Sequence, residues 1–69
     1  MKNQLTEREI DVLECLKKGL TNKEIGIVLN ITSHTVKAHV SAILEKLKCR
    51  NRTDAVISAI TRHQDLELP

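Results

Sequence analysis

The feature that most constrains the fold of this chain is a helix-start signature that recurs along it. An apolar residue, a threonine and, three residues after the threonine, a glutamate followed by an isoleucine occur in residues 5–10 and again in residues 20–25. In this pattern the threonine side chain caps a helix, the glutamate carboxylate accepts a hydrogen bond from the backbone N–H of that threonine, and the flanking apolar residues pack together. Residues 31–36 repeat the pattern without the acidic partner, and Asn51 precedes Asp54 by three residues. The chain therefore has four predicted helix starts.

The predicted helix ends agree with these starts. Lys17 and Lys18 complement the carbonyl end of the first helix, and Gly19 can adopt the left-handed conformation that ends it. Asn30 can do the same after a short second helix. The predicted helices span about residues 7–18, 22–29, 33–47 and 52–63, which makes an all-α, compact four-helix domain. Only a tight turn fits between the second and third helices, so the fold contains a helix-turn-helix.

The composition is that of one small helical domain. The 69 residues are predicted to form a single domain with a core at about residues 5–63 and short flexible ends, and they include no Phe, Tyr or Trp. The core must then consist of Leu, Ile, Val and Ala, and the aromatic stacking platforms of single-strand binders are excluded. Cys15 and Cys49 lack the spacing of a disulfide or redox motif. With no apolar run of membrane-span length and no signal peptide, we expect a cytoplasmic protein with no membrane contact.

Positive charge is concentrated in one part of the chain. Residues 34–52 carry five basic side chains against Glu45 alone, whereas residues 1–33 are balanced and residues 53–69 carry a net charge of −2. A basic segment is typical of a surface that binds a polyanion, although a charged stretch is more often a solvated face.

The third predicted helix combines an apolar stripe with a small, basic outer face. The stripe consists of Val36, Val40, Ile43, Leu44 and Leu47. A helix with such a face, preceded by a short helix and a tight turn, is the arrangement that enters the major groove of DNA. Lys37 can reach guanine acceptors, and the small Ala38 and Ser41 allow close approach to the base edges.

The residues also resemble a known family. The resemblance is seen in residues 5–9, 12–13, 19–25, 35–39, 43–47 and 52–56. It runs without a gap from residue 5 to about residue 60. Together these segments closely resemble the LuxR-type, or FixJ/NarL-type, helix-turn-helix domain of bacterial transcriptional regulators. Family members often carry an upstream receiver or ligand-binding domain, and a few are free-standing.

The resemblance implies roles for particular residues. The third helix would read bases with Lys37, Ala38, Ser41 and His34, whereas Asn22, Lys23, Thr35, His39 and Lys46 would contact or approach the phosphate backbone. The fourth helix would mediate a homodimer, and its residues nearest a free apolar edge are Ile57 and Ile60, unless Leu66 and Leu68 cover that edge. The partners implied are double-stranded DNA, a second copy of the chain and, as a further candidate, RNA polymerase.

Three positions depart from the family pattern. Ala42 replaces a frequent Asn, and Lys48 stands where Gly often follows the third helix. Gly26 stands where Ala is usual, which should cost the second helix about 1 kcal/mol relative to Ala.

Other classes of function fit the sequence less well. A promoter reader like region 4 of a sigma factor would not account for the residues that begin the fourth helix. A helical protein-interaction module that has lost DNA binding would suit the acidic first helix and the apolar fourth helix, but the only hint in its favour is that Ala42 replaces the frequent Asn. No catalytic set of nucleophile, base and orienting residue can be assembled, so we expect no enzyme and no small-molecule substrate. His34, His39 and Cys49 fit no usual zinc spacing, so we expect no metal and no cofactor.

Overall fold

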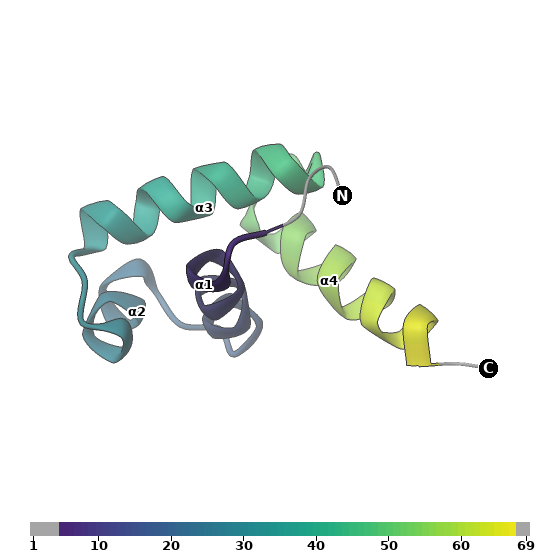
Figure 1. The fold of residues 1–69 in the computed structure, drawn as a ribbon, viewed down its shortest axis with the longest axis horizontal. Helices are drawn as coiled ribbons and strands as arrows, with labels where there is room; N and C mark the ends of the chain where they lie inside the picture. Colours follow the sequence, from purple (N-terminus) through teal and green to yellow (C-terminus); the bar gives the residue numbers. More distant parts are fainter. Residues whose placement is uncertain (1–4, 68–69) are drawn as a thin grey trace.

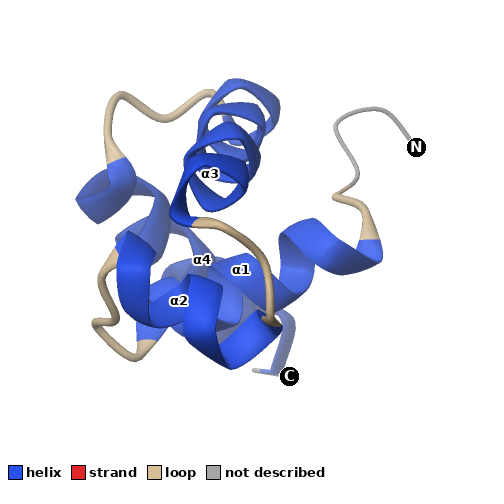
Figure 2. Cartoon of the chain, turned by 90° about the vertical axis from the view of Figure 1, so that its left-hand side faces the viewer, coloured by secondary structure: helices blue, strands red, loops and turns tan. Residues whose placement is uncertain are grey.

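The computed structural model describes residues 5–67, with side chains as far as Thr61. Its helices are α1 (Glu7–Lys17), α2 (Asn22–Leu29), α3 (Ser33–Leu47) and α4 (Arg52–Glu67). Helix α3 lies across α1 and α2, and the C-terminal half of α4 projects away from the other helices (Figure 1). The described residues form helices and loops without a strand (Figure 2). The predicted all-α four-helix fold is therefore confirmed.

Threonine side chains begin the first three helices, as predicted. Thr6 and Thr21 each accept a hydrogen bond from the backbone N–H three residues on, at 3.1 Å. In turn, the carboxylates of Glu9 and Glu24 accept a hydrogen bond from the backbone N–H of the threonine. Thr32 caps α3 alone by accepting from the N–H of Thr35 at 3.0 Å.

The fourth helix begins directly after the predicted asparagine cap and ends later than predicted. Asn51 Oδ1 accepts the N–H of Asp54 at 2.8 Å. Helix α4 continues to Glu67 instead of ending near residue 63. No Gly or Pro occurs between Arg52 and Leu68, so the sequence contains no residue that would stop the helix earlier.

Left-handed residues end the other helices or follow them directly. Gly19 has φ +83°, and Asn30 has φ 61° at the end of α2. Lys48 ends α3 with φ 58°, although it carries a side chain that disfavours this conformation. Lys48 thus keeps the left-handed backbone of the Gly that is usual at this position, at an energetic cost.

The core is aliphatic, and all four helices supply it. Its fully buried side chains are Val12, Ile25, Val36, Ile43 and Ala55. Helix α3 contacts every other helix, and so does α1, whereas α2 and α4 have no Cα atoms within 8 Å of one another. The two ends of the molecule are therefore joined mainly through α1 and α3.

Gly26 packs directly against the turn of the helix-turn-helix. Its carbonyl accepts the N–H of Ile31 at 2.9 Å, and a Cβ on Gly26 would lie 2.5 Å from the Ile31 carbonyl oxygen. The expected cost of glycine in α2 thus has a structural reason, because even a methyl group would force this turn to move.

Candidate nucleic-acid interface

The face of α3 opposite the core carries the four residues predicted to read bases. Val36, Val40 and Ile43 are buried against the other helices. The exposed residues of the opposite face include His34, Lys37, Ala38 and Ser41. Their spacing of three or four residues puts them in one row along the helix surface. The structure thus brings the predicted base-reading residues together on one accessible face.

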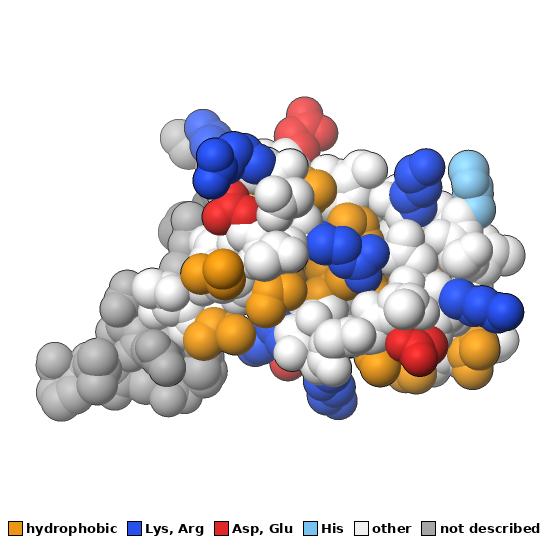
Figure 3. Space-filling model, turned by 180° about the vertical axis from the view of Figure 1, so that it is seen from behind, with side chains coloured by type: hydrophobic (Ala, Val, Ile, Leu, Met, Phe, Trp, Pro, Cys, Tyr) orange, Lys and Arg blue, Asp and Glu red, His pale blue; other side chains and the backbone are white. Residues whose placement is uncertain are grey.

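Basic side chains lie on this face and beside it, at the end of the molecule formed by α2 and the start of α3. On the right of Figure 3, where this end lies, basic side chains and a histidine reach into solvent beside an acidic group. Lys23 on α2 and Lys37 on α3 are both exposed and make no ion pair among the described residues. Their charges are therefore available to a polyanion.

The residues predicted to contact phosphate differ in their exposure and in the hydrogen bonds that they already make within the domain. Lys23 is exposed, and His39 is half-buried on α3. The Thr35 hydroxyl accepts a hydrogen bond from the Thr32 hydroxyl at 3.0 Å, so Thr35 contributes to the start of α3. Asn22 is half-buried, and its side-chain oxygen accepts a hydrogen bond from Arg52 Nη1 at 2.8 Å.

Lys46 is already bound to a carboxylate within the domain. Its ammonium donates to Glu9 Oε1 at 2.8 Å, and Glu9 is 5 % exposed while the Lys46 side chain is 33 % exposed. The hydrogen bond from Lys46, followed by that from the Thr6 backbone, lowers the pKa of the Glu9 carboxyl against the opposing effect of burial. A lysine ammonium has three donors, so Lys46 keeps hydrogen-bonding capacity beyond Glu9.

Helix α4 exposes the two isoleucines predicted for a dimer contact. Ala55 is buried, and Val56 and Ala59 pack against the core. Ile57 is 58 % exposed and Ile60 is 42 % exposed. The suggestion that Leu66 and Leu68 cover this edge falls outside the part of the chain whose side chains are described.

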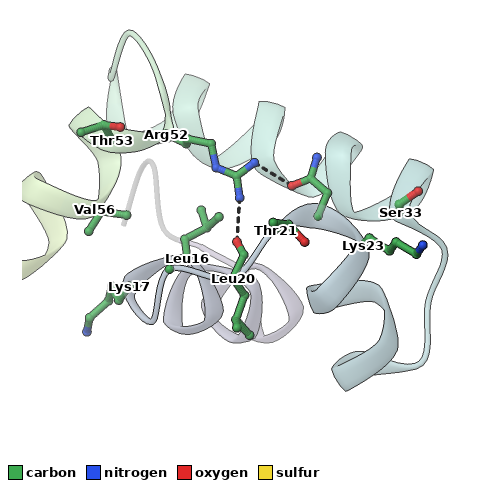
Figure 4. A pocket seen from close by; sticks show the side chains of 11 residues that line it. Leu16, Lys17, Leu20, Thr21, Lys23, Ser33, Arg52, Thr53 and Val56 are labelled. Atoms are coloured by element: carbon green, nitrogen blue, oxygen red, sulfur yellow. Dashed lines mark hydrogen bonds between the residues drawn. The ribbon is translucent and has the colours of Figure 1, made fainter.

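A shallow open hollow lies beside the start of α2. It is lined by residues from the α1–α2 loop and from the first turns of α2, α3 and α4, among them Asn22, Lys23, Ser33, Arg52 and Thr53. The guanidinium of Arg52 reaches across it to the carbonyl of Leu20 (Figure 4).

Comparison with known proteins identifies the family. Residues 3–59 match the model of a family described as bacterial regulatory proteins, luxR family. The chain belongs to this family. It is the family predicted from the residues, and its members regulate transcription through a helix-turn-helix that binds DNA.

Individual relatives agree with this identification of a luxR-family domain. The chain is 55 % identical over 53 residues to the nitrate/nitrite response regulator protein NarP of Escherichia coli, a match that covers 77 % of this chain and 25 % of NarP. It is 53 % identical over 55 residues to the glycerol metabolism activator of Pseudomonas putida and to the response regulator protein VraR of Staphylococcus aureus, which covers 80 % of this chain in each case. The chain spans about a quarter of the length of these curated relatives.

Two contacts of this luxR-family domain were not predicted from its sequence. Glu9 was identified only as a helix-capping residue, although it also binds Lys46. The sequence shows Arg52 only as one charge of the basic segment, although its side chain binds Asn22 and Leu20. Neither contact leaves a local signal, because the partners lie 30 to 37 residues apart.

Neither a membrane-spanning helix nor a cluster of metal ligands occurs in the described part of this luxR-family domain. Within residues 5–67, no helix is both long and apolar enough to cross a membrane. Among residues 5–61, whose side chains are described, no three His, Cys, Asp or Glu side chains gather closely enough to hold a metal ion.

Proposed function

We propose that this chain binds double-stranded DNA sequence-specifically, with α3 in the major groove. The observation that carries the proposal is the exposed row of His34, Lys37, Ala38 and Ser41 on the face of α3 opposite the core. The major groove admits an α-helix, and each base pair presents a distinct pattern of donors and acceptors there. Two side chains in the row are small, which lets the backbone of α3 approach the base edges.

Within this arrangement Lys37 reads bases and Lys23 contacts phosphate. Lys37 lies in the middle of the exposed row, where its ammonium can donate to guanine O6 or N7. Lys23 lies in the first turn of α2, beside the open hollow. Phosphate contacts orient a protein on the duplex without carrying sequence information, whereas base contacts give specificity.

The proposed phosphate contacts are completed by Asn22, Thr35, His39 and Lys46. Lys46 can serve two roles at once, because one of its donors binds Glu9 and the others remain for a phosphate. His39 and Thr35 lie on the same helix and are half-buried, so they would contact the backbone at the edge of the interface.

We further propose that the domain binds as a homodimer through α4. Ile57 and Ile60 are exposed and three residues apart, so they form one apolar edge of that helix. A two-fold contact through this edge would place two copies of α3 on a pseudo-palindromic site. The edge is small, so pairing would occur mainly on DNA.

The test begins with selection of binding sites from random duplexes by the purified domain. Replacement of Lys37 by alanine is then expected to weaken binding to the selected site by about 1–3 kcal/mol while most non-specific binding is kept. Lys23→Ala should weaken binding to all sequences alike and reduce the slope of log affinity against log salt by about 1.

Arg8→Ala is the matched control, since Arg8 is an exposed basic residue of α1 outside the helix-turn-helix. It should leave sequence preference unchanged. Absence of salt-sensitive duplex binding by the wild-type domain would refute the proposed function. An unchanged ratio of selected to random binding in Lys37→Ala would refute the role of Lys37.

A further inference from the structure

Arg52 is the first residue of α4, but its side chain binds the start of α2. Nη1 donates to Asn22 Oδ1 at 2.8 Å, and Nη2 donates to the carbonyl oxygen of Leu20 at 3.1 Å. Since α2 and α4 have no Cα atoms within 8 Å of each other, these bonds are a direct side-chain link between the two helices. Figure 4 shows this two-pronged contact at the edge of the hollow.

The contact determines which end of the Asn22 amide faces outward. A guanidinium has only donors, so it can bind the oxygen of the amide and not the nitrogen. Nδ2 makes no hydrogen bond to any described residue, and the described part of the chain contains no buried side-chain nitrogen or oxygen without a partner. The NH₂ group of Asn22 is therefore accessible and directed away from Arg52. Without Arg52, rotation of the amide could present the oxygen instead.

We propose that Arg52 is a positioning residue for DNA binding, which holds the NH₂ group of Asn22 toward a backbone phosphate. The inference rests on the proposed function, in which Asn22 contacts the backbone. Beside Asn22, the hollow is lined by the further donors Lys23, Ser33 and Thr53. An amide that turned its oxygen to this hollow would repel a phosphate, whereas its NH₂ group donates to one.

The geometry also explains why an arginine suits this position. The planar fork of a guanidinium binds two acceptors at once, here the side-chain oxygen of Asn22 and the backbone carbonyl oxygen of Leu20. A lysine ammonium concentrates its donors at a single point and is less suited to bridge them. Arg52 therefore acts on DNA through Asn22 and uses two of its N–H groups within the domain.

A double-mutant cycle on duplex binding tests the inference. Asn22→Ala and Arg52→Met are each expected to weaken binding roughly tenfold, the effect of losing one hydrogen bond to a charged group. The double variant should also lose roughly tenfold instead of a hundredfold, because both changes remove the same phosphate contact.

The matched control is Arg50→Met, which removes the same charge from an exposed residue two positions earlier. In the double variant with Asn22→Ala, the two losses of affinity should multiply, since the Arg50 side chain makes no hydrogen bond to Asn22. All affinities are measured well below the melting temperature of the least stable variant, so a loss of folding does not contribute. If Arg52→Met does not fold, Arg52→Lys takes its place in the cycle.

A second readout follows the Asn22 side-chain amide by NMR. In the wild-type domain, addition of duplex DNA should shift its NH₂ resonances strongly, and Arg52→Met should abolish that shift. Wild-type affinity in Arg52→Met, a multiplicative loss in the double variant, or an unchanged NH₂ shift would each overturn the inference. Absence of duplex binding by the wild-type domain would instead overturn the proposed function.

Discussion

Lys46 Nζ and Glu9 Oε1 lie 2.8 Å apart and join the last turn of α3 to the first turn of α1. The same carboxylate oxygen accepts the backbone N–H of Thr6 at 2.9 Å, so one atom completes both a helix cap and an ion pair. Glu9 is the buried charged side chain of the described core. The contact therefore stabilises the packing of α1 against α3.

This pair should make the stability of the domain depend on pH. Because the folded state lowers the pKa of Glu9 below its ordinary value of 4.5, the contribution is fully present above about pH 4.5 and is lost as pH falls through the lower folded pKa. We expect Glu9→Gln to lower the free energy of unfolding by about 1–3 kcal/mol at pH 7, with the difference from wild type shrinking under acid. Urea unfolding at a series of pH values from neutral to acid measures both the loss of stability at pH 7 and its decrease at low pH.

Glu24→Gln is the matched control for the Glu9 variant. Glu24 makes the same capping interaction with Thr21, but it is exposed and pairs with no lysine among the described side chains. Glutamine can also close a capping box, so we expect only a small loss. Equal losses in the two variants would show that the ion pair contributes nothing beyond the cap.

Ile60→Glu should separate DNA binding from dimer formation. Ile60 is 42 % exposed, so the change should preserve the fold and binding to a half-site while it abolishes cooperative occupancy of a full site. Ile10→Glu on α1 is the matched control, because Ile10 is 46 % exposed on another helix. Footprinting on full and half sites measures the cooperativity. Wild-type cooperativity in Ile60→Glu would exclude α4, at least through Ile60, as the contact.

Gly26→Ala should not give the stabilisation that helix propensity alone implies. The added Cβ would meet the Ile31 carbonyl oxygen at 2.5 Å, so the turn must shift and the gain of about 1 kcal/mol expected from propensity should be lost. Gly26→Val should be worse by roughly 1–3 kcal/mol, because a larger side chain overpacks the same contact. Thermal and urea unfolding of both variants test this. A gain near the full propensity value in Gly26→Ala would contradict the proposed crowding.

Lys48→Gly should stabilise the domain. Lys48 has φ 58°, a conformation that costs a residue with a Cβ roughly 1 kcal/mol or more and costs glycine little. Part of the gain is offset by the greater freedom of glycine in the unfolded chain, so we expect about 0.5–1 kcal/mol. Asn30→Gly is the comparison, because asparagine tolerates φ 61° better and should gain less. A loss of stability in Lys48→Gly would contradict the assigned strain.

The sequence by itself determined the local parts of this structure. Each helix start depends on a side chain and an N–H group three residues away, and Thr6, Thr21, Thr32 and Asn51 all cap as predicted. The face of α3 that carries Lys37 followed from the helical period, because the apolar stripe must turn inward. These features were predictable because each depends only on residues within a few turns of one helix.

Only the tertiary structure decided which distant residues meet. Glu9 binds Lys46 across 37 positions and Arg52 binds Asn22 across 30, and neither pair is specified by spacing or composition. The crowding of Gly26 by Ile31 likewise depends on the path of the turn between α2 and α3. Local patterns determine where helices begin and which face is apolar, whereas the packing of whole helices determines which polar side chains come within hydrogen-bonding distance.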